Sequence, residues 1–208
     1  MLPPGEPKFR RRPAERPEEI LAAALEVFAE RGFAAARVEE VACRAGVSKG
    51  AVYLYFETKE ALFRAVVTQS IAPNLNQVAS LAAIEAPFEP TVRAVFAMIS
   101  QRMASDWRMS GVIKLVIAES RNQPELARIW HDAMIAPALG LASRLIEAGQ
   151  RQGVVRLGDA RYFAMGLMGP VLLGTLWRET FEPIGAEPVQ VDRLITQHVE
   201  TCLKGMRP

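Results

Sequence analysis

The side chains best suited to chemistry lie in one short segment, Gly46–Phe56, with the sequence GVSKGAVYLYF. Ser48 is a good N-cap for a helix from Lys49 to Tyr55, and the free backbone N–H groups at that helix start attract anions such as phosphate. The ammonium of Lys49 adds a positive charge at the same end. Tyr53 and Tyr55 offer hydroxyl donors on stiff, flat side chains, which suit a phosphate or the edge of a base. The segment therefore has the chemistry to contact a nucleic acid.

The same helix divides into a buried face and an exposed face. Val52 and Phe56 are four residues apart and point inward with Val47 ahead of them. The residues left outside are Lys49, Gly50, Ala51, Tyr53 and Leu54, with Tyr55 at the edge. Gly50 costs a helix about 1 kcal/mol relative to alanine, but its missing side chain lets DNA approach the backbone. The Ala51 methyl can contact a thymine methyl. We favour DNA binding, and a tight helical hairpin with surface tyrosines is the alternative.

Two helices before this segment position it. In RPEEILAAALEVFAERGF the apolar residues recur with helical spacing along one face, and Gly32 ends the helix as a left-handed cap. The apolar face of Val38–Ala45 predicts a second, short helix that Gly46 stops. Two short helices joined by a turn of about three residues form a helix-turn-helix, whose second helix enters the major groove. Thr58 caps a fourth helix, and Lys59 in its first turn opposes the helix dipole unless a phosphate lies there.

Composition excludes several other classes of protein. The chain has 208 residues, 50% of them hydrophobic, which allows a sizeable core, and its net charge of +2 says little. Two cysteines, Cys43 and Cys202, and two histidines, His131 and His198, provide neither a disulfide framework nor zinc spacing. Catalytic and phosphate-loop motifs are missing, so we expect no enzyme, cofactor or metal. The chain start does not resemble a signal peptide, and glycine and proline interrupt the uncharged run Tyr162–Trp177, so we expect a cytoplasmic protein without a membrane partner.

The first 16 residues form a basic segment. Between residues 8 and 16, five basic side chains outnumber Glu15 and give a charge of +4; they are Lys8, Arg10, Arg11, Arg12 and Arg16. We expect a flexible arm over residues 1–16 that adds phosphate contacts with little sequence preference. A solvated tail is the alternative.

The rest of the chain also has helical patterns, so the predicted fold class is all-α. Apolar stripes predict helices over residues 88–103, 109–120, 124–152, 160–181 and 189–204. Pro137 should kink the third of these. We expect three parts: the basic arm (1–16), a three-helix helix-turn-helix domain that binds DNA (17–64), and a larger helical domain (65–208) that binds an effector and forms a dimer.

Two stretches, FAERGF and VEEVACRAGVSKGAVYLYFETKEALF, form an ordered pattern over Phe28–Leu62. A helix ends in Gly-Phe, a Gly-Val-Ser turn follows the second helix, and the next helices carry Gly-x-Val-Tyr-x-Tyr-Phe and Thr-Lys-Glu. This pattern resembles the DNA-binding domain of the TetR family of bacterial regulators. The resemblance implies a dimer on a palindromic double-stranded DNA operator, most often a repressor. It places base contacts at Lys49, Gly50, Ala51 and Tyr53, and phosphate contacts at Ser48, Leu54, Tyr55 and Lys59.

The chain departs from the family pattern at the contact surface. The family commonly has Thr or Ser at the start of helix 2, where this chain has Ala36 and Arg37. The cap is lost, but Arg37 can contact phosphate. Ala51 is often Thr in the family and Leu54 is often His, Tyr or Trp. The operator sequence of a relative therefore does not predict the operator that this chain binds.

The family resemblance also implies a dimer interface in the last two helices, two from each subunit. The expected interface residues are Phe163, Gly166, Leu167, Pro170, Val171, Gly174, Trp177, Leu194, Ile195, Val199, Cys202 and Leu203. They mix small and large side chains on a nearly uncharged helix and continue along an apolar stripe on the last one. A core within one chain is the alternative.

The larger domain binds the effector in the family, and KLVIAESRNQPELARIWHD is similar to the AefR-like group. The pocket candidates are Phe96, Ile99, Met103, Trp107, Leu115, Trp130, Met134, Met165 and Met168. Methionine and tryptophan suit an adaptable pocket for a small, largely apolar or aromatic effector, although such residues also build ordinary cores. The candidate polar anchors are Arg102, Glu119, His131 and Arg178.

Three functions compete at this point. The first is a dimeric transcriptional regulator, usually a repressor, that an effector releases from DNA. The second is a DNA-binding or architectural protein without an effector, controlled by a protein partner or by its abundance. The third is a small helical enzyme, for which the sequence offers no acid–base or nucleophilic constellation.

Overall fold

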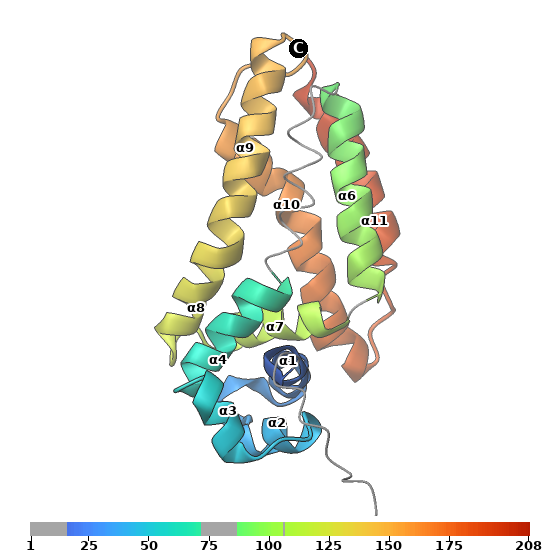
Figure 1. The fold of residues 1–208 in the computed structure, drawn as a ribbon. Coiled ribbons are helices and arrows are strands. Elements are labelled where there is room, and N and C mark those ends of the chain that lie inside the picture. The colour runs from blue at the N-terminus through green and yellow to red at the C-terminus, as the bar shows by residue number, and fades with distance from the viewer. Residues whose placement is uncertain (1–15, 72–86, 106) are drawn as a thin grey trace, which may run out of the picture.

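The described part of the protein is all-helical, and an upright bundle stands on a smaller group of helices, α1 to α4 (residues 16–65; Figure 1). A computed structural model describes residues 16–71, 87–105 and 107–208, and within these ranges the regular structure is helical throughout, with no strand. The predicted fold class is confirmed. The basic arm, apart from Arg16, lies outside the described residues.

Four helices form the smaller group: α1 (Arg16–Ala35), α2 (Val38–Arg44), α3 (Lys49–Tyr55) and α4 (Lys59–Ala65). The positive φ of Gly32, +75°, breaks the helical backbone of α1 near its end, at the residue expected to cap it. Since α2 and α3 are short and joined by a tight turn, they have the predicted helix-turn-helix arrangement.

The helices α3 and α4 begin at the capping residues that the sequence predicted, Ser48 and Thr58. The Ser48 hydroxyl accepts the N–H of Ala51 at 3.1 Å, and the Thr58 hydroxyl accepts the N–H of Ala61 at 3.0 Å. Each bond satisfies a backbone donor that has no partner within the helix. Capping therefore fixes where α3 begins, and with it which side chains α3 exposes.

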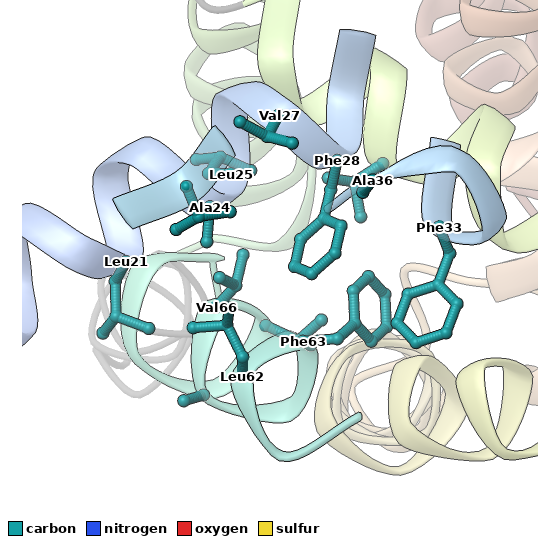
Figure 2. Close-up of a cluster of buried hydrophobic side chains, with 14 of the residues drawn as sticks. Leu21, Ala24, Leu25, Val27, Phe28, Phe33, Ala36, Leu62, Phe63 and Val66 are labelled. Carbon is teal, nitrogen blue, oxygen red and sulfur yellow. The ribbon is translucent and has the colours of Figure 1, made fainter. Parts of the chain in front are cut away.

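An aromatic trio holds these helices together (Figure 2). The rings of Phe28, Phe33 and Phe63 pack with centroids 5.6 to 5.8 Å apart. Such rings bury large areas and favour offset or edge-to-face contacts. The apolar cluster around them also includes side chains from the larger domain; these are Val112, Leu115, Val116, Leu126, Ile129 and Trp130. The division of the chain at residue 64 stays a prediction.

The remaining helices build the upright bundle. Their bounds are η1 (Val66–Ile71), α6 (Phe88–Ser105), α7 (Trp107–Glu119), α8 (Pro124–Trp130), η2 (His131–Ile135), α9 (Ala136–Arg151), α10 (Ala160–Leu176), η3 (Trp177–Phe181), η4 (Glu182–Ile184) and α11 (Val191–Met206). In Figure 1, α8 and α9 stand on one side, α6 and α11 on the other, and α10 between them. The disturbance expected at Pro137 is a π-helical segment, η2, directly before the first turn of α9. None of the described helices is long and apolar enough to cross a membrane.

A proline inside α10 removes one of its backbone hydrogen bonds. Pro170 has no N–H with which to reach the carbonyl of Gly166, four residues earlier. The ring of His198, on α11, places its Nε2 atom 2.9 Å from that oxygen. We conclude that His198 supplies the missing donor and ties α11 to α10.

The helix α7 lies directly against α1, and this is the main contact between the two parts of the molecule (Figure 1). Gly111 allows it, since a Cβ atom there would lie 2.7 Å from the Cβ of Ala29 and 3.0 Å from its Cα. Polar bonds flank the crossing. Glu119 accepts the N–H of Ala34 at 3.3 Å, and Arg64 on α4 binds Glu125 on α8 at 2.6 Å.

Gly111→Ala is expected to lower the free energy of unfolding by about 1–3 kcal/mol, because the added methyl forces two helix backbones apart. Chemical denaturation followed by circular dichroism measures this. Gly205→Ala is the matched control, since a Cβ at Gly205 meets nothing within 4 Å. The control should be neutral or stabilising by up to about 1 kcal/mol. Equal stability of the two variants would contradict the close crossing.

Candidate nucleic-acid interface and ligand cavity

The outer face of α3 presents the residues that the sequence analysis predicted to be exposed. Val52 is buried, whereas Tyr53 and Tyr55 each expose 41% of their surface and Leu54 exposes 81%. Gly50 and Lys49 are also exposed, and Ala51 is half-buried. A Cβ at Gly50 would meet only the Ser48 hydroxyl, at 3.9 Å. Packing within the chain therefore does not require a glycine at position 50. Close approach of another molecule to the helix backbone is the physical reason that remains for it.

Lys49 is held in place by an acidic neighbour on α2. Its ammonium lies 2.5 Å from the carboxylate of Glu39 and 5.7 Å from the centre of the Tyr53 ring. Glu39 raises the pKa of Lys49, and the Lys49 ammonium lowers the pKa of Glu39. The three side chains form a connected exposed group at the start of α3. Arg37, at the N-cap of α2, is exposed as well and makes no capping bond.

Lys59 is bonded within the smaller domain, and the phosphate contact predicted for it stays a prediction. Its ammonium donates to the carbonyls of Phe33 at 2.7 Å, Ala36 at 3.0 Å and Ala34 at 3.3 Å, and lies 4.5 Å from the Phe33 ring centre. An ammonium has three protons, so these carbonyls engage all of its donors. The last residues of α1 and Ala36 after it therefore supply the negative partners that offset the unfavourable position of Lys59 at the start of α4.

A cavity of about 520 Å³ lies in the bundle, lined by α6, α7, α8, η2, α9 and α10. Seven of the predicted pocket residues line it: Phe96, Ile99, Met103, Trp130, Met134, Met165 and Met168. Leu115 does not, because it lies on the face of α7 that packs into the core around α1. Trp107 begins α7, but its side chain lies outside the described residues. That an effector occupies the cavity stays a prediction.

The candidate polar anchors are scattered. Arg102 lines the cavity and is the only charged residue among the described lining residues. Glu119 instead accepts a backbone N–H near the end of α1. His131 is exposed, and its Nδ1 atom lies 2.8 Å from Oδ1 of Asp132. Arg178 donates to the Met103 carbonyl at 2.8 Å and to the Ser110 hydroxyl. The wall is therefore almost entirely apolar.

The predicted dimer residues separate into two groups. Leu167, Ile195, Val199 and Leu203 are buried in the core of the subunit, and so are Pro170 and Gly174. These six are corrected, because the chain itself already covers them. Phe163, Val171, Trp177, Leu194 and Cys202 are half-buried, and Gly166 is exposed.

The exposed uncharged residues of α10 form a set of which the predicted interface included only Gly166. Sequence reasoning missed the others because the run Tyr162–Trp177 is uncharged on every side, which gives no periodic signal for an inner face. We call this set the α10 stripe: Tyr162, Met165, Gly166, Gly169, Leu172 and Leu173, all exposed. Tyr162 exposes 71% of its surface and Leu173 53%.

The other reactive side chains show no sign of activation. The Cys202 sulfur lies 3.1 Å from His198 Nε2, but burial raises the pKa of the thiol, the opposite of what a nucleophile needs. Cys43 is exposed and makes no disulfide. Among the described residues, no group of three or more His, Cys, Asp or Glu side chains could hold a metal ion.

Comparison with known proteins matches both parts of the chain. Residues 20–66 match the pattern of bacterial regulatory proteins of the tetR family, and residues 91–205 match the C-terminal domain of AefR-like transcriptional repressors. The transcriptional repressor BepR of Brucella suis is 29% identical over 147 residues, which cover 67% of this chain and 68% of BepR. The repressor NicS of Pseudomonas putida is 30% identical over 142 residues, 67% of this chain and 65% of NicS. The regulator YerO of Bacillus subtilis is 37% identical, but over only 32% of this chain and 23% of YerO.

Solved structures share the fold. FadR of Bacillus subtilis, in complex with stearoyl-CoA, superposes with a TM-score of 0.75 at 21% identity, covering 91% of this chain and 99% of FadR. SmeT, the repressor of a multidrug efflux pump in Stenotrophomonas maltophilia, superposes in its triclosan complex with a TM-score of 0.77 at 21% identity, covering 93% of this chain and 92% of SmeT. At these identities the likeness establishes the fold alone.

Lys59→Met is expected to destabilise the protein by about 1–3 kcal/mol, because it keeps the apolar stem but leaves three carbonyls without their donor. Thermal and chemical unfolding measure this. Lys49→Met is the matched control: it removes an exposed ion pair, which water and salt screen, and should leave the stability nearly unchanged. Equal stability losses in the two variants would mean that Lys59 does not hold the end of α1.

Proposed function

Because the chain belongs to the TetR family of bacterial regulators, we propose that it is a dimeric, sequence-specific DNA-binding repressor that a small, largely apolar or aromatic effector releases. The observation that carries this proposal is the exposed face of α3, where Lys49, Tyr53 and Leu54 project from a helix fixed by its cap and its buried valine. A bacterial chromosome lies in the cytoplasm, so the protein acts there.

On DNA, α3 enters the major groove. Lys49, Gly50, Ala51 and Tyr53 face base edges, while Ser48, Leu54, Tyr55 and Arg37 lie toward the backbone; Lys59 supports the domain from inside. Glu39 must accompany Lys49 into this surface because the two are joined at 2.5 Å. A carboxylate near DNA repels phosphate, so the pair favours sites where a base edge compensates for that repulsion. The basic arm, if it follows the backbone, adds contacts without base specificity.

The operator is found by selecting bound fragments from genomic DNA with the purified protein. On that operator, Tyr53→Ala is expected to weaken binding by about 1–3 kcal/mol, because it removes one of the few side chains able to reach a base edge or a phosphate. Binding is measured by fluorescence anisotropy at fixed salt, and Tyr53→Phe shows whether the hydroxyl or the ring matters. Unaltered binding by Tyr53→Ala would place the interface elsewhere.

Dimerisation follows from the α10 stripe. The run Tyr162–Trp177 carries no charge, and its exposed part is apolar or glycine. Contiguous exposed apolar patches on a protein surface mark interaction sites. In a twofold dimer each residue approaches the same surface of its partner, so an uncharged stripe is complementary to itself. The last helix, α11, contributes Leu194 at the margin.

Leu173→Glu is expected to convert the dimer into a monomer at micromolar concentration, since the symmetry brings two buried carboxylates into one interface. An unpaired buried charge costs about 3–5 kcal/mol, so the dimer dissociation constant should rise by more than about 100-fold. Sedimentation equilibrium measures it. Ala94→Glu, on an exposed position of α6 away from the cavity wall, is the control and should remain dimeric. A dimeric Leu173→Glu variant would rule out the stripe as the interface.

The cavity supports control by an effector rather than by a protein partner or abundance alone, for which a filled core is expected. Its lining reaches the DNA-binding part directly, because Val116 and Trp130 line the cavity and also belong to the core around α1. The SmeT and FadR structures bind triclosan and stearoyl-CoA in the same fold. An effector acts only by its different affinity for the two states of the protein. Thermal stabilisation by members of an apolar compound library tests for it.

A further inference from the structure

We propose that the effector cavity is completed by the second subunit, so that effector binding and dimerisation strengthen each other. The inference rests on the proposed function, because it needs both a dimer and an apolar ligand. Three residues carry it. Met165, Gly169 and Leu172 line the cavity, and the same three residues belong to the α10 stripe.

On this side the cavity wall is one side chain thick. Met165 and Leu172 each face the cavity and still expose 49% and 47% of their surface to solvent. Between them, Gly169 contributes no side chain at all, and a Cβ there would meet nothing within 4 Å. Much of the remaining wall is buried, as at Val116, Trp130, Phe96 and Ile146, while Ile117 on α7 is a single exposed apolar lining residue at 47%. On α10 three exposed lining residues follow one another along one helix, so this is the stretch of wall that a helix of a partner can cover.

The covering surface that fits is a second copy of this chain. The exposed residues of the α10 stripe that do not line the cavity, Tyr162, Gly166 and Leu173, belong to the same uncharged strip. A Cβ at Gly166 also meets nothing within 4 Å, so a partner helix can approach the backbone of α10 closely at both glycines. Twofold symmetry places the partner's stripe against this one, over the outer faces of Met165 and Leu172.

The consequence is thermodynamic linkage. Without the partner, an apolar ligand in the cavity has only a solvated wall on the α10 side, and part of the gain from removing apolar surface from water is lost. With the partner present, the same side chains are fixed and dry. The factor by which the partner subunit raises the affinity for the ligand equals the factor by which the ligand raises the affinity of the two subunits for each other.

The test uses N-phenyl-1-naphthylamine, an uncharged apolar probe that fluoresces on leaving water, with full-length protein. The wild-type dimer is compared with the Leu173→Glu monomer, whose substitution lies outside the cavity lining, and with the Ala94→Glu control. We expect about tenfold weaker probe binding by the monomer and unchanged binding by the control. Sedimentation of wild type at saturating probe should show the dimer dissociation constant lowered by the same factor.

The outcomes separate this inference from the proposed function. Equal probe affinity in the wild-type dimer and the monomer, with no effect of probe on dimer dissociation, overturns the inference and leaves an effector site within one subunit. A wild type that binds no probe, or that is already monomeric, overturns both. Should the variant not fold, dilution of wild type through its own dissociation constant answers the same question: probe affinity must fall as the dimer dissociates, and constant affinity overturns the inference.

Discussion

The contact between α7 and α1 is the constraint on which the rest of the structure depends. Gly111 brings the two helices so close that even a methyl group does not fit between them and Ala29. Val112 and Leu115 on α7 therefore belong to the core of the smaller domain, while Met109 and Ile113 pack at the edge of that core and also line the cavity. A single helix is thus the wall of one site and the support of the other. The ion pair of Arg64 and Glu125 and the bond of Glu119 to the end of α1 hold the same two layers together.

Local rules were enough to predict the exposed face of α3, because its determinants are close in sequence. The cap at Ser48, the inward Val52 and the exposed tyrosines all follow from a few residues of α3. Lys59 shows where such rules end. From the sequence, only the dipole of α4 could be considered, and a cation at the start of a helix is unfavourable in that field. The carbonyls that Lys59 binds lie 23 to 26 residues earlier in the chain. A long-range partner can reverse a local expectation, and only the fold reveals the partner.

The dimer residues could not be separated from the core for a related reason. Amphipathic helices show their buried face through a period of 3.6 residues, but the run Tyr162–Trp177 is uncharged on every side and has no such period. Leu167 and Leu173 look equivalent in sequence, yet Leu167 is buried in the core of the bundle and Leu173 is exposed. The same helix also breaks a local rule at Pro170, and His198 from α11 makes the missing bond. Both features depend on how α10 and α11 pack.

In the proposed function, these contacts restrict how an effector releases the protein from DNA. A ligand that displaces Met109 or Ile113 moves α7, and α7 cannot slide over Ala29 because the crossing has no free space. Separating α7 from α1 would expose Val112 and Leu115, which are buried in the shared core. The smaller motion is for α1 to follow α7 and carry α2 to α4 with it as one body, held by the three phenylalanines and by Lys59. In the proposed dimer such a rotation alters the distance between the two α3 helices, which must match half-sites about 34–36 Å apart. In the proposed function, the rigidity of the crossing is therefore what transmits a change in the cavity to the DNA-binding helices.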